Sequence, residues 1–264
     1  MRSAHPLAPV AMPGTDSRRP VPDELASRQR ELEAYQEVIR RCRACVEAGY
    51  LPAARPVFLG HAGQRVMVVG QAPAQPRSEH PRPYSGASGR TLRSWLAQAG
   101  FPPQELETFC YLTSVTKCFP GPSRSGKGDR APSAAEVALC RRHLERELAL
   151  VQPAVVITLG RLAARWFLGD RPLSELVGEV FTWPAPWLPP AQENGTQRQD
   201  LSGNGAPGEA GVLVLPLPHP SGVNRWCNDP ANRERLARAL TRLAELRRRL
   251  NLEPVYPGAG PARS

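Results

Sequence analysis

The sequence contains no run of about 18 uncharged apolar residues, the length that a helix needs to cross a bilayer. Its first 20 residues are rich in Pro, Ser and Arg and lack the continuous apolar core of a secretory signal peptide. These absences predict a cytoplasmic protein that does not enter the membrane. Because the cytosol keeps thiols reduced, we expect the six cysteines to be metal ligands or buried side chains rather than disulfides.

Lysine is almost absent, since 32 of the 34 basic residues are arginines, and the formal net charge is +10. Residues 1–34 and 251–264 are each charge-balanced and residues 184–211 carry a net −2, so the positive charge lies in the remainder. Positive charge in the folded part suits a polyanionic partner such as DNA. The arginine bias and the 30 prolines also fit a GC-rich genome. Charge alone therefore leaves both interpretations open.

One principal domain is expected, because 264 residues with 41% apolar composition can bury a sizeable core. We expect residues 1–34 to form a disordered tail and the start of a first helix. Residues 35–250 would be the folded domain, with a flexible insertion at about 184–211. Residues 251–264 would be a C-terminal tail.

Short β-branched apolar runs alternate along the chain with segments of helical periodicity. The pattern predicts strands over 65–70, 109–115, 154–160 and 211–218, and helices over 23–43, 89–99, 133–151, 161–168 and 230–250. Ser133 and Glu136 have the spacing of a capping box at one helix start. The alternation predicts an α/β protein of three α/β/α layers, with a central, mostly parallel sheet of about four strands. Ligands of such sheets bind at the carboxyl ends of the strands, so the loops after Gly70, Thr113 and Pro218 should surround one crevice.

Four cysteines are candidate metal ligands. Cys42 and Cys45 have the spacing of a chelating turn, and thiolates are soft ligands suited to zinc or iron–sulfur clusters. Cys118 follows a predicted strand and Cys140 lies on a predicted helix, so the four could converge only through folding. From spacing alone, Cys118 and Cys140 could equally be buried small apolar side chains.

The two other cysteines favour packing roles, because Cys110 lies inside a predicted strand and Cys227 in a polar loop without a partner motif. The sequence also lacks the pairing of His-x-Glu with Pro-Cys-x-x-Cys that zinc-dependent nucleic-acid deaminases need, because no proline precedes its Cys-x-x-Cys. The sequence therefore argues against that class of enzyme.

A series of motifs follows in order over about residues 35–250. They are Cys42-Arg-Ala-Cys45, Arg55-Pro-Val-Phe, Val68-Val-Gly-Gln-Ala-Pro73, Arg82-Pro-Tyr-Ser-Gly-Ala-Ser-Gly89, Ser114-Val-Thr-Lys-Cys118, Cys140, Val156-Ile-Thr-Leu-Gly160 and His219-Pro-Ser-Gly-Val-Asn224. In this order and spacing the chain resembles the iron–sulfur uracil-DNA glycosylases called type 4, with some features of type 5. The resemblance implies a [4Fe-4S] cluster held by Cys42, Cys45, Cys118 and Cys140.

The resemblance also implies excision of a base flipped out of DNA into a pocket. The backbone of Gln71 and Ala72 would contact the base and the hydrolytic water, and Tyr84 would replace a Phe that stacks on the base. His219 would donate a hydrogen bond to uracil O2, stabilising the negative charge that develops on the departing pyrimidine. Taken alone, a histidine before proline is as readily a loop residue that caps a turn.

The segment after His219 is the predicted DNA-binding loop of a monomer that binds duplex or single-stranded DNA. Ser221, Asn224 and Arg225 are its expected contacts, with Arg225 on phosphates. Val223 or Trp226 could fill the space that the flipped base leaves, and ordinary packing is an equal alternative for Trp226.

Three positions depart from the family pattern. Gln71 stands where type 4 enzymes carry Glu, so it can orient water but cannot accept its proton. Ser114 replaces an Asn that reads the uracil edge, and one hydroxyl makes fewer contacts than an amide. Ala87 replaces an Asp of type 5 enzymes, which leaves Glu79 and, less plausibly, Asp129 as nearby carboxylates. We therefore expect a DNA repair glycosylase with weak or altered base preference; the alternative is a catalytically silent DNA-binding member that recognises lesions.

Overall fold

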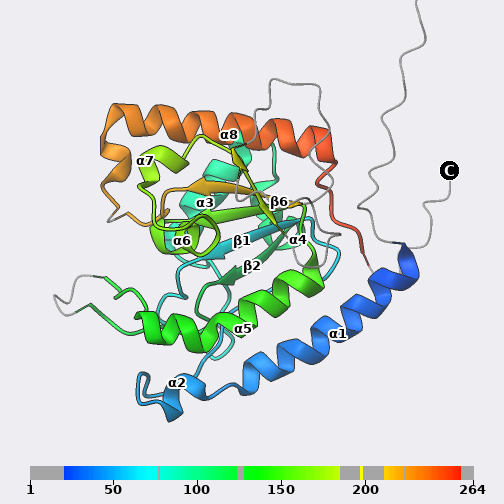
Figure 1. Ribbon diagram of the computed structural model, residues 1–264, viewed down its shortest axis with the longest axis vertical. Helices are drawn as coiled ribbons and strands as arrows, with labels where there is room; N and C mark the ends of the chain where they lie inside the picture. The colour runs from blue at the N-terminus through cyan, green and yellow to red at the C-terminus, as the bar shows by residue number, and fades with distance from the viewer. Residues whose placement is uncertain are drawn as a thin grey trace, which may run out of the picture.

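A six-stranded sheet forms the centre of the computed structural model, which describes residues 21–76, 78–123, 128–184, 197–198, 211–222 and 224–256 (Figure 1). The strand order is β2-β1-β3-β6-β4-β5. The strands are β1 (Val66–Gly70), β2 (Cys110–Ser114), β3 (Val155–Leu159), β4 (Phe181–Pro184), β5 (Gln197–Arg198) and β6 (Gly211–Leu217). The first four in the spatial order run parallel, and β4 runs antiparallel to both β6 and β5. The four predicted strands are thus confirmed as the parallel part of the sheet.

Helices cover both faces of this sheet, as the three-layer prediction requires (Figure 1). They are α1 (Pro22–Arg41), α2 (Ala44–Glu47), α3 (Ala87–Gln98), α4 (Leu106–Phe109), α5 (Ala134–Val151), α6 (Arg161–Leu168), α7 (Leu173–Leu176) and α8 (Pro230–Leu250), with 3-10 turns η1 (Pro103–Glu105) and η2 (Trp226–Asn228). No helix in the described ranges is long and apolar enough to cross a membrane.

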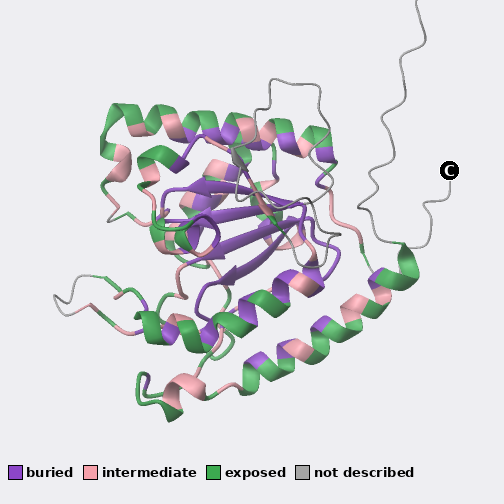
Figure 2. Cartoon of the chain, viewed as in Figure 1, coloured by how far each residue is buried: buried purple, intermediate pink, exposed green. Residues whose placement is uncertain are grey.

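The period-two alternation of the strands divides the apolar core between the two faces. In β1, Val66 and Val68 pack in the cluster that contains side chains of α3, α4 and α8. Met67 and Val69 pack in the opposite cluster, with α1, α5 and α6. Figure 2 shows the buried strands between helices whose outer faces are exposed. Continuous apolar runs therefore mark strands buried on both sides.

Local signals fix the start of α5 as the sequence predicts. Ser133 Oγ accepts a hydrogen bond from the Glu136 backbone N–H at 3.3 Å, and Glu136 Oε2 accepts one from the Ser133 N–H at 2.8 Å. The capping box satisfies two N–H groups that would otherwise lack partners at the helix end. It sets the starting point of the helix that carries Cys140.

The sheet is larger than the expected four strands, because it also contains β4, which ends at Pro184 where the expected insertion begins, and β5, which lies inside that insertion. Most of 184–211 lies outside the described residues, as do 1–20 and 257–264. After α8, residues 251–256 of the expected C-terminal tail pack on the domain. Leu252 is fully buried, and the Val255 N–H donates to the Gly63 carbonyl at 2.9 Å.

Candidate active site and cysteine cavity

The carboxyl ends of four parallel strands bring the predicted catalytic segments to one edge of the sheet. Gly70 ends β1 and pairs in register with Ser114, which ends β2. Gly160 follows β3, and its N–H donates to the Leu217 carbonyl at the end of β6, two residues before His219. We call Gln71, Ala72, Tyr84, Ser114 and His219 the strand-end site.

Tyr84 lies against the end of β1, with its hydroxyl directed into the protein. A Cβ atom on Gly70 would stand 2.6 Å from Tyr84 Oη and 3.4 Å from Ser114 Oγ, so the glycine leaves room for the phenol. The ring is only partly buried, but its hydroxyl is inaccessible to solvent and has no hydrogen-bond partner among the described residues. Burial raises the pKa of Tyr84 well above its ordinary value of 10, so the phenol remains a hydrogen-bond donor.

The backbone around Tyr84 is constrained. Tyr84 has φ 52°, a left-handed conformation that costs energy for an aromatic residue. A Cβ atom on Gly89 would lie 1.6 Å from the Tyr84 carbonyl oxygen, so α3 can approach the loop only with glycine at that position. The start of α3 therefore holds Tyr84 above the strand ends.

The loop after β1 is fastened to the chain after β2. The Val115 N–H donates to the Gly70 carbonyl at 2.9 Å, and the Thr116 N–H donates to the Gln71 carbonyl at 3.2 Å. Gln71 and Ala72 are both half-buried. The position of the Gln71 backbone thus depends directly on residues 115–116.

His219 is half-buried and is held by its own loop. The Ser221 backbone N–H donates to His219 Nδ1 at 3.3 Å, and the Asn224 side-chain amide donates to the His219 carbonyl at 2.7 Å. Asn224 Oδ1 in turn accepts from the Trp226 N–H at 3.1 Å. Because Nδ1 accepts a hydrogen bond, a neutral imidazole at this position carries its proton on Nε2 and can donate it.

The surroundings of His219 favour the neutral imidazole. Burial lowers the pKa of His219 below its ordinary 6.5, and the Asp129 carboxylate acts in the opposite direction. Gly160 has φ 85°, and a Cβ atom there would lie 3.2 Å from His219 Cβ. Of the two carboxylates weighed from the sequence, Asp129 thus influences His219, whereas Glu79 is an exposed loop residue.

The predicted DNA-binding loop divides into held and exposed parts. Arg225 is exposed; its carbonyl accepts from the Asn228 N–H at 2.9 Å, but its guanidinium has no hydrogen bond or ion pair among the described residues. Both polar side-chain atoms of Asn224 are hydrogen-bonded within the loop, and Ser221 is half-buried. Trp226 packs against the core, which favours the packing alternative, and Val223 lies outside the described residues.

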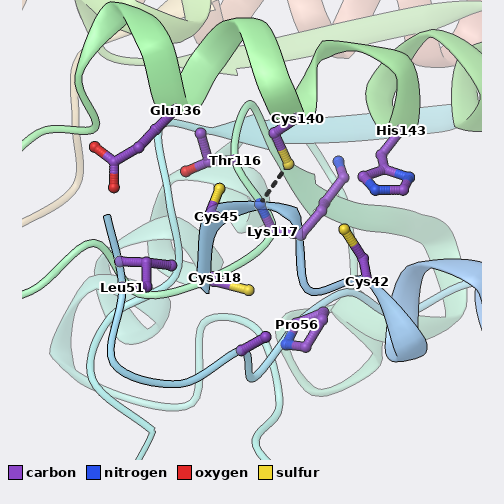
Figure 3. A pocket seen from close by; sticks show the side chains of 11 residues that line it. Cys42, Cys45, Leu51, Pro56, Thr116, Lys117, Cys118, Glu136, Cys140 and His143 are labelled. Carbon is purple, nitrogen blue, oxygen red and sulfur yellow. Dashed lines mark hydrogen bonds between the residues drawn. The ribbon is translucent and has the colours of Figure 1, made fainter. Parts of the chain in front are cut away.

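The four candidate ligand cysteines line one cavity, which we call the cysteine cavity (Figure 3). Cys42 ends α1 with extended backbone, so the helix stops two residues before the predicted end, and Cys45 lies in α2. Cys118 follows β2, and Cys140 projects from α5. The other lining residues are Leu51, Ala54, Pro56, Thr116, Lys117, Glu136 and His143. Cys110, buried in β2, and Cys227 in η2 do not line it.

The chemistry of the cavity suits thiolate ligands of a cluster. The Lys117 N–H donates to Cys140 Sγ at 3.3 Å, and the Arg55 N–H hydrogen-bonds to Cys118 and lowers its pKa. Burial outweighs this donor and raises the pKa of Cys118 to about 12; it raises that of Cys45 to about 11, with neighbouring thiols adding to both. Four soft ligands and two N–H donors fit an iron–sulfur cluster. Among the described residues, no group of three or more His, Cys, Asp or Glu side chains is arranged to hold a single metal ion.

A three-layer architecture with a glutamine loop after β1 and a histidine loop after β6, at the same edge of the parallel sheet, defines a class of base-excision proteins, and residues 57–244 match it. The chain belongs to the uracil DNA glycosylase superfamily. It is 29% identical over 162 residues to the type-4 uracil-DNA glycosylase of Archaeoglobus fulgidus, covering 57% of this chain and 74% of that protein. The type-4 enzyme of Thermotoga maritima is 26% identical over 171 residues, covering 61% and 78%. A type-5 enzyme of Pyrobaculum aerophilum is 32% identical over 145 residues, covering 51% and 61%.

Sequence reasoning located the strand-end loops and missed a buried ion pair beside them. Lys117 and Glu147 were not singled out, although both lie in the protein interior. The available signal was Glu147, which falls seven residues after Cys140 and therefore on the same inward face of α5. A carboxylate on the buried face of a helix requires a partner.

Proposed function

We propose that this protein hydrolyses the N-glycosidic bond of uracil, or of another deaminated base flipped out of DNA, as a step in DNA repair. The observation that carries the proposal is the arrangement of His219. Its Nδ1 accepts a backbone hydrogen bond while the residue stands at the strand edge shared with Gly70 and Ser114. Nε2–H is then the donor offered to a base bound at this edge.

The reaction needs stabilisation of the departing base more than a strong nucleophile. Cleavage leaves negative charge on the pyrimidine, and a preorganised donor aimed at its oxygen stabilises the transition state more than the ground state. Gln71 lacks a carboxylate, so its role is to orient water through its amide and its fastened backbone. An oxocarbenium-like sugar is electrophilic enough to be attacked by water that is positioned in this way.

One hydroxyl replaces an amide as the group that contacts the base edge. Ser114 Oγ lies beside Gly70, 3.4 Å from where a Cβ atom on that glycine would stand. A hydroxyl rotates and can donate or accept, whereas an amide has a fixed pattern of one acceptor and two donors. This pocket is therefore expected to discriminate less sharply between uracil and other deaminated bases.

We further propose that Cys42, Cys45, Cys118 and Cys140 hold a [4Fe-4S] cluster. The cluster supplies a structural cross-link, because hydrolysis of a glycosidic bond requires no electron transfer. The cysteines come from the end of α1, from α2, from the segment after β2 and from α5. Their shared ligation would join the N-terminal helices to the segment that carries Ser114.

Single-turnover assays with wild-type protein on oligonucleotides containing uracil, hypoxanthine, xanthine or mismatched thymine test the proposal. Excision of at least one base, with the fastest rate on a deaminated base, is the expected result. Tight DNA binding without excision of any of them would instead identify the silent lesion-binding member, an outcome consistent with Gln71 and Ala87 replacing carboxylates.

A further inference from the structure

A buried ion pair lies between the strand-end site and the cysteine cavity. Lys117 Nζ lies 2.5 Å from Glu147 Oε2, with side-chain exposures of 2% and 0%. Glu147 also accepts hydrogen bonds from Tyr111 Oη at 3.0 Å and from Thr113 Oγ1 at 2.9 Å. Burying two charges is costly unless their remaining hydrogen bonds are satisfied, as they are at this carboxylate.

Lys117 contacts both functional regions of the protein. Its ammonium donates to the Ser114 carbonyl and to Thr113 Oγ1, each at 2.6 Å, while its backbone N–H donates to Cys140 Sγ at 3.3 Å. The side chain thus turns back along its own segment to the end of β2, and the main chain faces the cavity (Figure 3).

We propose that Lys117 is a positioning residue for base excision, whose buried ammonium fixes the end of β2 and, through it, the loop that carries Gln71. The inference rests on the proposed function. Residues 115 and 116, which lie between Ser114 and Lys117, donate the two hydrogen bonds that hold Gly70 and Gln71. Lys117 Nζ holds the carbonyl of Ser114, three residues earlier in the chain. Residues 114–117 are thereby closed into a rigid turn.

A merely structural ion pair would behave differently from a positioning residue. Removing one charge from a buried pair leaves the other uncompensated and destabilises the fold, whereas neutralising both is often tolerated. A structural role would therefore be restored by neutralising both partners. The hydrogen bond to the Ser114 carbonyl would not be restored, since a methionine side chain at position 117 has no donor.

The test compares Lys117→Met with the double variant Lys117→Met/Glu147→Gln, in which the glutamine keeps an acceptor for Tyr111. We expect the melting temperature to fall in the single variant and to recover most of its value in the double variant. Single-turnover excision should stay lower by on the order of 100-fold in both variants, because a small misplacement of reacting groups lowers a rate by about this factor. Hydrogen–deuterium exchange of a peptide covering residues 112–118 should be faster than in wild type in both.

A matched control is Arg242→Met/Glu179→Gln, which removes a partly buried ion pair of 2.9 Å between α8 and the chain before β4. It should leave excision and exchange of residues 112–118 unchanged. Iron content should match wild type in all variants. Loss of iron in the double variant would assign the effect to the cysteine cavity and overturn the proposal.

Recovery of both excision and exchange protection along with stability would also overturn it, as would lost protection with wild-type excision. Failure of the proposed function shows separately, as inertness of the wild type on every substrate. The exchange comparison then still decides whether Lys117 fixes the segment, because it does not depend on catalysis.

Discussion

The backbone N–H of Ser221 donates a hydrogen bond to Nδ1 of His219 across 3.3 Å. This contact selects the tautomer of the neutral imidazole, because a nitrogen that accepts cannot also carry the proton. The remaining proton lies on Nε2, the nitrogen available for a substrate. A turn of two residues thereby prepares the side chain to act as a donor.

Replacing His219 by Ala should lower single-turnover excision by on the order of 100-fold or more. DNA affinity should remain nearly unchanged, because this hydrogen bond strengthens as charge develops on the leaving base. His80→Ala, at an exposed loop position, is the control and should retain the wild-type rate. A His219→Ala variant that loses activity only through weaker DNA binding would contradict this role.

The pH dependence of excision should reflect the lowered pKa of His219. Above that pKa the imidazole is neutral and Nδ1 accepts from Ser221; protonation at lower pH removes the acceptor and disrupts the turn. The single-turnover rate should therefore persist from pH 8 to below 6.5, and its acid limb should lie below 6.5. Asp129 raises this pKa, so Asp129→Asn should move the acid limb to still lower pH, most visibly at low salt. An acid limb above 6.5, or one that Asp129→Asn moves upward, would be inconsistent with this assignment.

The parallel part of the fold could be predicted because each strand carries its own local signal. Val66–Gly70 is a β-branched run that ends at glycine, and its side chains alternate between two apolar clusters, as its burial on both faces requires. Strand β4 escaped prediction because it is four residues long and ends at Pro184. Its partner, β5, has only two residues, too few for any periodicity to show.

Side-chain geometry at the site was predictable only in part. The resemblance named His219 and Tyr84, but the left-handed backbone of Tyr84 depends on the approach of Gly89, which sequence spacing does not reveal. The Lys117–Glu147 pair joins residues 30 positions apart on different elements, so only the folded chain brings the two charges together.

Gln71→Glu should raise uracil excision by placing a water-directing carboxylate on the loop that residues 115–116 fasten. Adding Ser114→Asn should narrow the preference toward uracil, since an amide has the fixed pattern that O4 and N3–H match. The measurement is the ratio of single-turnover rates on uracil and on hypoxanthine. If the wild type and the double variant are both inert while binding DNA tightly, the hydrolase interpretation fails.

Anaerobically purified protein should be brown and contain about four irons per chain, as a cubane cluster on four thiolates requires. Cys118→Ser and Cys140→Ser should lose iron and solubility. Cys110→Ser and Cys227→Ser, at positions outside the cysteine cavity, are the matched controls and should keep iron. A colourless protein with one zinc, or iron loss in Cys227→Ser, would show that the cluster assignment is wrong.

Arg225 provides the test of the DNA-binding surface, because it is exposed in the His219 loop and its guanidinium has no partner among the described residues. If the basic face meets on the order of six phosphates, affinity should fall about a thousandfold between 50 and 200 mM salt. Arg225→Ala should weaken binding to all sequences alike and reduce the magnitude of the log–log salt slope by about 1, the loss of one phosphate contact. Arg171→Ala removes an arginine that is ion-paired with Glu175 and stacked on Phe181, so it should leave the slope unchanged. Binding that does not depend on salt would point to a protein or small-molecule partner instead of DNA.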